Sequence, residues 1–130
     1  MPAVLIEVRR SYTREQQAAL IDAVHGGLRD ALRLPEWDRT VRLVTHDAAC
    51  FAASPRLKQP ENFTLITINL FAGRSLEAKR ALYRGIRERL EALGIARDHV
   101  NIVLVESERE NWGLRGVPGS EIELGFKVEV

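Results

Sequence analysis

The first residue that could do chemistry is Pro2, which follows the initiator methionine in the opening stretch MPAVLIEV. Aminopeptidases commonly remove methionine when the next residue is small. Removal would leave Pro2 with a free secondary amine in place of an amide nitrogen. A free α-amine has an ordinary pKa of about 7.7–8.0, so it can serve as a general base near neutral pH. Many proteins begin with Met-Pro without using it, so the prediction depends on a site forming around Pro2.

Arg74, in the stretch FAGRSLEAK, is the second candidate. It lies between the end of an expected strand and the start of an expected helix, where unpaired N–H groups and the helix dipole favour an anion. Its guanidinium is a forked donor that matches a carboxylate, and Gly73 allows close approach of a ligand. A solvated surface arginine is the competing interpretation, and the two are about equal on spacing alone.

Two halves of the chain are expected to position these residues. Each reads as strand, helix, strand, over about 1–46 and 63–106. The first helix starts with a capping box from Thr13 to Gln16, and Ser75 caps the second. The stretches LPEWDRTVRLV and GIARDHVNIVLV resemble one another, which indicates an internal duplication. We therefore predict one domain over 1–130, an α/β (α+β) fold with a duplicated β-α-β unit.

The two units should form one four-stranded mixed sheet with both helices on one face. Pro2 and Arg74 then share an end of the sheet if their strands run in opposite directions, as a pseudo-twofold between the halves would arrange. The other face of the sheet also reads as apolar, so self-association is expected to cover it. The tail, about 120–130, alternates apolar and mostly polar residues and predicts a C-terminal strand that could pair with a neighbouring subunit. Residues 47–62 read as a long loop, either a lid or a tether.

Composition narrows the function classes. A formal charge of +1 over 130 residues gives no reason to expect nucleic acid or a membrane surface as a partner. The start carries no signal-type segment, and no stretch is long enough to span a bilayer, so a cytoplasmic protein is the default. The single cysteine, Cys50, excludes an intrachain disulfide and a multi-cysteine zinc site. With no metal constellation and no nucleotide-binding loop, no cofactor is expected.

Taken together, several stretches resemble the tautomerase superfamily, whose members begin with a catalytic proline. They are MP at the start, DAVHGGL, LPEWDRTVRLVTH, GRSLEAKRALY and VESERENWGLRG, which together cover nearly the whole chain. The sequence is most similar to malonate semialdehyde decarboxylase and related tautomerase-like proteins, and it resembles a fused pair of 4-oxalocrotonate tautomerase subunits. The resemblance implies a β-α-β fold, a homotrimer, and a small carboxylate substrate.

The resemblance also implies residue roles. Pro2 would be the catalytic amine, Arg74 would bind or polarise the substrate carboxylate, and Asp38 would act near the proline. The residues matched to the substrate pocket, or counted with it, are His25, His46, Trp112, Arg115 and Phe126. Each of these roles has a structural alternative. Asp38 could be a carboxylate that caps a turn, and Trp112 could be a hydrophobic anchor. His25 on the first helix could be a satisfied, partly buried histidine, and the same alternative applies to His46 at the end of a strand.

One departure from the pattern bears on the reaction. The similar decarboxylases and dehalogenases carry a second arginine just before the one that matches Arg74, whereas this chain has Phe71 and Ala72. Arg115 or a neighbouring subunit would have to supply that cation. The leading prediction is therefore a keto–enol tautomerase that acts on a small 2-oxo or enol acid. The alternatives are a decarboxylase or hydratase of a 3-oxo acid, and a non-catalytic trimeric binding protein.

Overall fold

A computed structural model describes residues 2–130, and its two long helices begin at the caps that the sequence predicts. In α1 (Arg14–Leu32), the Thr13 hydroxyl accepts a hydrogen bond from the Gln16 N–H, and the Gln16 side chain accepts one from the Thr13 N–H. In α2 (Leu76–Ala92), the Ser75 hydroxyl accepts from the Ala78 N–H. These contacts pair N–H groups that have no partner within the helix, so local sequence fixes where each helix starts.

The strands of the main sheet lie in the order β2-β1-β3-β4. Their bounds are Ala3–Val8 for β1, Val41–Thr45 for β2, Thr64–Phe71 for β3 and Val100–Ser107 for β4. β1 is parallel to β2 and β3 is parallel to β4, whereas β1 and β3 are antiparallel. This confirms the mixed sheet built from two β-α-β units. Because β1 and β3 run in opposite directions, the beginning of β1 and the end of β3 lie at the same end of the sheet.

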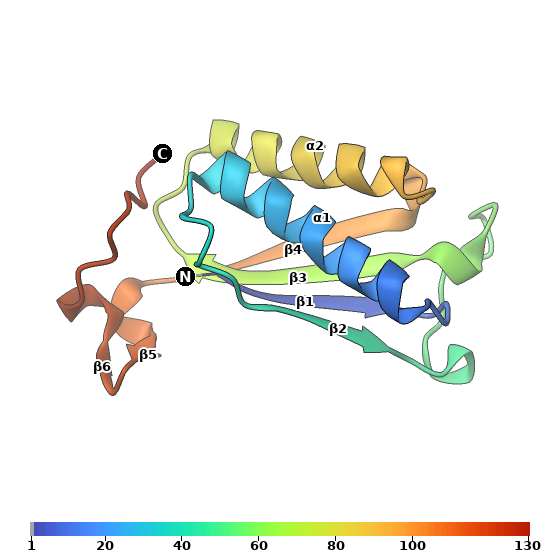
Figure 1. Ribbon diagram of the computed structural model, residues 1–130, viewed down its shortest axis with the longest axis horizontal. Coiled ribbons are helices and arrows are strands. Elements are labelled where there is room, and N and C mark those ends of the chain that lie inside the picture. The colour runs from blue at the N-terminus through green and yellow to red at the C-terminus, as the bar shows by residue number, and fades with distance from the viewer. Residues whose placement is uncertain (1) are drawn as a thin grey trace.

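Both helices pack on one face of the sheet (Figure 1). The core between them consists of alternate strand residues and one stripe from each helix: Val4, Ile6, Val8, Ile66, Ile68, Leu70, Leu20, Val24, Leu28, Leu32, Leu82, Ile86 and Leu90. The helices approach closely at Gly27, where an added Cβ would lie 2.7 Å from Cγ1 of Ile86. Glycine at this position therefore sets the spacing of the two helices over the sheet.

The opposite face of the sheet is left without a covering layer by the described part of the chain (Figure 1). Apolar side chains lie on it, and Val103 and Val105 of β4 are 47% and 44% exposed. The predicted apolar second face is therefore present, and an additional layer would be needed to bury it.

No helix among residues 2–130 is long and apolar enough to cross a membrane.

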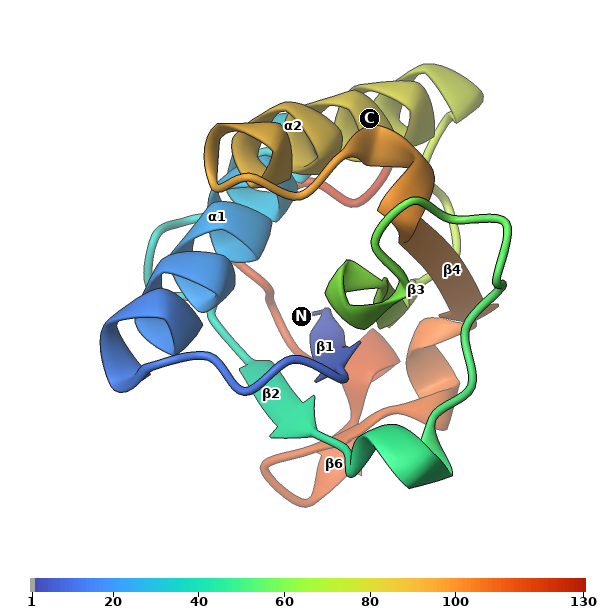
Figure 2. The same cartoon turned by 90° about the vertical axis from the view of Figure 1, so that its right-hand side faces the viewer.

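The long loop, residues 47–62, lies at the end of the sheet opposite to Pro2 and is tied to the body of the protein (Figure 2). The Gln59 N–H donates to Nε2 of buried His99 at 3.1 Å, and Arg10 donates to the Asn62 side chain at 3.0 Å. Two short 3-10 turns, Ala48–Cys50 and Pro60–Asn62, interrupt it. These contacts hold the loop against the body of the protein, and its position keeps it away from the Pro2 end of its own chain.

The predicted C-terminal strand over 120–130 is wrong for the single chain. A small hairpin of β5 (Gly113–Leu114) and β6 (Val117–Pro118) precedes the tail, and the tail itself is irregular. Burial still alternates, with Ile122, Leu124, Phe126 and Val128 more buried than their neighbours. The alternation predicted from the sequence is present, but a strand also needs a backbone partner, and residues 2–130 bring no strand alongside this segment.

Candidate active site

The candidate site lies where the beginning of β1 meets the end of β3 (Figure 1). Pro2 is buried, directly before β1, and the register pairs Ala3 with Asn69. Arg74 follows the end of β3 after a turn in which Gly73 has φ +121°. A left-handed turn of this kind favours glycine. The antiparallel pairing thus brings Pro2 and Arg74 to one end of the sheet, as the duplicated pattern predicts.

Arg74 is a buried cation, with only 9% of its surface exposed. Its Nη1 donates to the backbone carbonyl of Leu32 at 2.7 Å, which satisfies one of the carbonyl groups left open at the end of α1. Burial lowers the pKa of the Arg74 guanidinium, and the charges of Glu129 and Asp38 raise it in part. The solvated surface arginine considered from the sequence is therefore not what the structure contains.

Asp38 reaches the same end through the turn between α1 and β2. It is 4% exposed, and its N–H donates to the Pro35 carbonyl at 3.1 Å. Two residues later, the Thr40 carbonyl accepts from the Val4 N–H at 3.0 Å, so this turn lies against the beginning of β1. Asp38 thus places a buried carboxylate in this turn, and its charge acts on Arg74.

An aromatic wall stands beside these groups, after the ends of β3 and β4. The ring of Trp112 meets the ring of Phe71 edge-on, with centroids 5.1 Å apart. The indole Nε1 of Trp112 donates to Oγ of Ser107 at 2.9 Å, which fixes the orientation of its ring. Trp112 is half-buried. Its packing on Phe71 is that of a hydrophobic anchor at the Pro2 end of the sheet, and a role in a substrate pocket stays a prediction.

Arg109, which the sequence pattern does not indicate, joins this wall. Its guanidinium carbon lies 5.8 Å from the centroid of the Phe71 ring. Its Nη2 donates to the carbonyls of Gly119 and Ile122 at 3.3 and 3.1 Å. It lines a cleft of about 320 Å³ together with tail residues that include Phe126. The nearby stretch ERENWG was the available signal, but only the fold places Arg109 over Phe71.

Arg115 and Phe126 lie in the segment that follows β4, Arg115 in the β5–β6 hairpin and Phe126 in the C-terminal tail. Arg115 is exposed at the turn of the β5–β6 hairpin with φ +51°, and it lines a small cavity of about 140 Å³. Phe126 packs against the core and forms part of the cleft beside Arg109. Of the two arginines, Arg109 is the one in contact with Phe71.

The two histidines matched to the substrate pocket, His25 and His46, lie in different parts of the structure. His25 is 2% exposed on the inner side of α1, with Nε2 3.7 Å from Oε1 of Glu36. His46 lies at the opposite end of the sheet, because β2 is parallel to β1 and pairs Thr45 with Val8. Its Nε2 is 2.7 Å from Oε2 of Glu7, and its ring stacks on Phe51. The structure therefore corrects the placement of His46 beside Pro2 within one chain, since matching by position carried no information about strand direction.

The chemistry available at this end is that of a buried proline, one buried cation, buried carboxylate charge and an aromatic wall. Among residues 2–130, no group of three or more histidine, cysteine, aspartate or glutamate side chains is placed to hold a metal ion. The cation and the neighbouring N–H groups at the start of α2 can hold a carboxylate or an oxyanion. A nitrogen base beside them could move a proton to or from carbon.

Comparison with known proteins finds tautomerases. Residues 38–115 match the family model described as tautomerase enzyme. The chain is 26% identical over 116 residues to the probable tautomerase YusQ of Bacillus subtilis, covering 86% of this chain and 91% of that protein.

Solved structures give the same result. Malonate semialdehyde decarboxylase, described with decarboxylase and hydratase activities, is 26% identical, with a TM-score of 0.76 over 85% of this chain and 88% of the other. A fused 4-OT trimer, at 19% identity, shares the fold with a TM-score of 0.80 over 91% and 96% of the two chains. The family model spans more than half of the chain, and this protein therefore belongs to the tautomerase family.

Proposed function

We propose that this protein is a cofactor-independent keto–enol tautomerase in which the amine of Pro2 acts as general base on a small 2-oxo or enol carboxylic acid. The observation that carries the proposal is the placement of buried Pro2 and buried Arg74 at one end of the sheet. The proposal requires that methionine is removed, since an amide nitrogen cannot take up a proton at neutral pH.

In the proposed reaction, Arg74 binds the carboxylate of the substrate. Pro2 removes the proton of the enol hydroxyl, the electrons form the carbonyl, and the double bond takes up a proton at carbon from the Pro2 ammonium. No atom is gained or lost by the substrate. The guanidinium and the free N–H groups at the start of α2 stabilise the oxyanion that develops during the transfer. Burial and the charge of Arg74 both lower the pKa of such an amine, which favours the base form.

The test is ketonisation of phenylenolpyruvate, followed by the loss of enol absorbance. Replacing Pro2 by alanine keeps a small second residue, so methionine removal is preserved, but it replaces the secondary amine with a primary one. We expect Pro2→Ala to lose most of the activity, whereas Arg14→Ala, which changes an exposed residue, should match the wild type. Intact mass shows whether methionine is absent in each protein. Equal rates for the wild type and Pro2→Ala would remove Pro2 from the mechanism.

The second candidate function is decarboxylation or hydration of a 3-oxo acid, and Asp38 is the observation that favours it. A buried carboxylate at the Pro2 end raises the pKa of the amine, and a protonated proline acts as an acid or an electrostatic catalyst. The similarity to malonate semialdehyde decarboxylase points the same way.

The two candidates respond to Asp38→Asn with opposite signs. Loss of the carboxylate charge should lower the pKa of the Pro2 amine, which nitrogen NMR can measure in both proteins. A base mechanism then keeps or gains ketonisation rate at pH 7. An acid mechanism loses decarboxylation of malonate semialdehyde.

We also propose a homotrimer, in keeping with the trimeric fused 4-OT. If the wild type lacks both activities yet binds small carboxylates, the protein is the non-catalytic trimeric binding protein given as the third alternative, and not an enzyme.

A further inference from the structure

Trp37 is an exposed aromatic residue next to the candidate site, and the proposed reaction gives it no role. It is 67% exposed, whereas Asp38, the next residue along the chain, is 4% exposed. A single exposed hydrophobic residue is normal on a protein surface. Trp37, however, forms one wall of a cavity that apolar side chains also line. An indole at an apolar cavity is an arrangement that binds apolar or aromatic groups of a ligand.

This cavity, which we call the Trp37 cavity, has a volume of about 140 Å³. Besides Trp37, its lining consists of Leu114, Arg115, Ile122, Glu123 and Leu124. The two charged residues carry opposite charges, so the lining has no net charge. An apolar cavity of about 150 Å³ in another protein binds one benzene molecule. The Trp37 cavity therefore matches a single six-membered aromatic ring in volume and in polarity.

The Trp37 cavity is adjacent to the candidate site on two sides. On one side, Trp37 directly precedes Asp38, a buried carboxylate whose charge acts on the cation of the site. On the other side, an added Cβ at Gly119 would lie 3.5 Å from both Cδ1 of Leu114 and Cζ of Phe71. Leu114 thus connects the cavity to the aromatic wall. A group in the cavity can therefore belong to a molecule that is bound at the candidate site.

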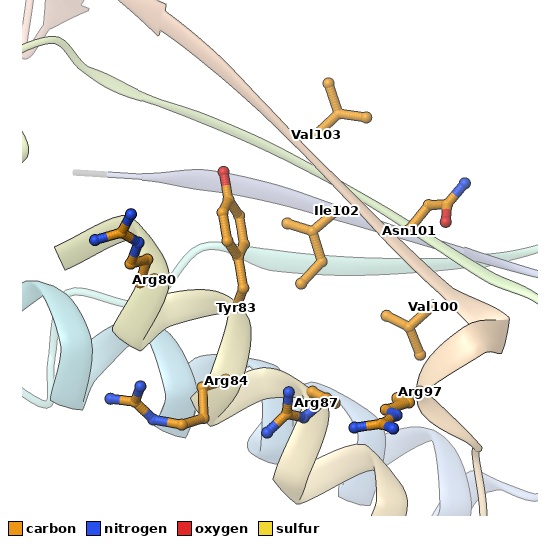
Figure 3. A pocket seen from close by; sticks show the side chains of 9 residues that line it. All are labelled: Arg80, Tyr83, Arg84, Arg87, Arg97, Val100, Asn101, Ile102 and Val103. Atoms are coloured by element: carbon orange, nitrogen blue, oxygen red, sulfur yellow. The ribbon is translucent and has the colours of Figure 1, made fainter. Parts of the chain in front are cut away.

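A larger hollow, of about 660 Å³, lies between α2 and β4 (Figure 3). Four arginine side chains and the beginning of β4 line it. Because β4 is parallel to β3, its beginning lies at the end of the sheet away from the candidate site. Residues 104–107 of β4, each with a rise of about 3.3 Å, separate the two, and a small acid held at Arg74 does not span this length.

The cleft beside Arg109 lies at the same end of the sheet as the candidate site. Four of its eight lining residues are charged, however, so it suits an apolar ring less well than the Trp37 cavity does.

We propose that the Trp37 cavity binds an aromatic ring of the substrate, so that Trp37 selects 2-oxo or enol acids that carry a phenyl-sized substituent. This inference rests on the proposed function and names the substrate class of the same site. The carboxylate of the acid lies at Arg74, and its ring packs on the indole of Trp37 in the offset or edge-on arrangement that aromatic pairs prefer. A substituent with a charge of its own would lose its hydration against the apolar walls. Dicarboxylates are therefore expected to bind less tightly than aryl acids.

The first test measures binding without turnover. 3-Phenylpropanoate carries a carboxylate and a phenyl ring but no enol, and butanoate carries the carboxylate without the ring. The chain has two tryptophans, so Trp112→Phe leaves Trp37 as the only one. In this variant 3-phenylpropanoate should shift the tryptophan emission to shorter wavelength and shield it from acrylamide, because the ring displaces water from the indole. Butanoate should do neither. The same shift is expected after Pro2→Ala is added, so this readout does not depend on the catalytic amine.

The second test compares affinities by calorimetry. Trp37→Ala should weaken the binding of 3-phenylpropanoate by about tenfold, because it removes the aromatic contact and the apolar area of the indole. The affinity for butanoate should not change. Trp37→Phe retains an aromatic ring and should recover most of the lost affinity. Leu93→Ala removes another exposed apolar side chain, outside the candidate site, and should bind both acids as the wild type does.

Equal affinity of the wild type and folded Trp37→Ala for 3-phenylpropanoate would overturn the inference. So would unchanged emission of Trp37 in a Trp112→Phe protein that calorimetry shows to bind this acid, or a wild type to which the phenyl ring adds no affinity over butanoate. Failure of the proposed function has a different signature. In that case Pro2→Ala keeps the ketonisation rate, while binding of the ring in the Trp37 cavity is unaffected.

Discussion

Replacing Arg74 separates its structural role from its proposed catalytic role. Its Nη1 donates a charged hydrogen bond to the Leu32 carbonyl at 2.7 Å, inside the protein. Hydrogen bonds to charged groups contribute about 1.5–3 kcal/mol. We therefore expect Arg74→Ala to lower the free energy of unfolding by about 2 kcal/mol, and for a domain of this size to lower Tm by about 6–10 °C.

The effect on catalysis should be larger than this loss of stability explains. Removal of one donor to a developing oxyanion typically costs about 10²–10³ in rate. At 20 °C Arg74→Ala is expected to remain folded, so kcat/KM for ketonisation should fall by about that factor. Arg74→Lys keeps the charge but not the planar fork, so it should recover part of the rate and little of the hydrogen bond to Leu32.

The assay combines urea unfolding, monitored by tryptophan fluorescence, with ketonisation rates at several substrate concentrations. Arg14→Ala, which removes an exposed positive charge, controls for net charge. If folded Arg74→Ala retains kcat/KM within about threefold of the wild type, Arg74 does not bind the substrate, because a transition-state donor costs far more. The buried arginine would then serve only to close the end of α1, and the proposed anion site would have to be abandoned.

Three further predictions concern packing, the tail and surface charge. Gly27→Ala should lower the free energy of unfolding by about 1–2 kcal/mol, because overpacking against the facing isoleucine exceeds the gain in helix propensity. Gly85→Ala should lower the free energy of unfolding by less, because an added Cβ there meets its neighbours at 3.4 Å or more. Arg109→Gln should release the two tail carbonyls that it binds, seen as faster amide exchange after Pro118, and unchanged exchange would show that the tail does not need it. The hydrogen bond from Arg29 lowers the pKa of Glu36 from its ordinary value of 4.5. The ionised Glu36 carboxylate therefore stabilises the folded protein above pH 4.5, and this stabilisation is lost as the pH falls through the lowered pKa of the folded state. In Arg29→Leu, NMR titration should find the pKa of Glu36 raised.

Much of the fold could be predicted because its determinants are local. Thr13 and Ser75 are caps that satisfy helix N–H groups within four residues, and alternating apolar runs mark all four strands of the sheet. The repeated order of elements predicted antiparallel central strands. That prediction alone placed Pro2 and Arg74 at the same end of the sheet.

The predictions that were wrong or missing concern contacts between segments that are distant in the sequence. The tail has a strand pattern, but pairing requires a neighbouring backbone, and its own chain offers none. His46 was assigned to the Pro2 site by resemblance, yet the parallel pairing of β1 and β2 carries it to the opposite end. Arg109 was overlooked because nothing in its local sequence indicates that its guanidinium lies over Phe71, 38 positions earlier in the chain.

The balance of charge around Arg74 bears on both of the proposed reactions. Two carboxylates, Asp38 and Glu129, act on this single cation. A neutral Pro2 amine leaves negative charge in excess there, which favours protonation, while burial of the amine favours the neutral form. Glu129 belongs to the tail, which Arg109 binds at the carbonyls of Gly119 and Ile122. If Pro2 is the catalytic amine, we therefore expect its protonation state, and with it the choice between base and acid chemistry, to depend on how the tail is held as well as on the groups at the end of the sheet.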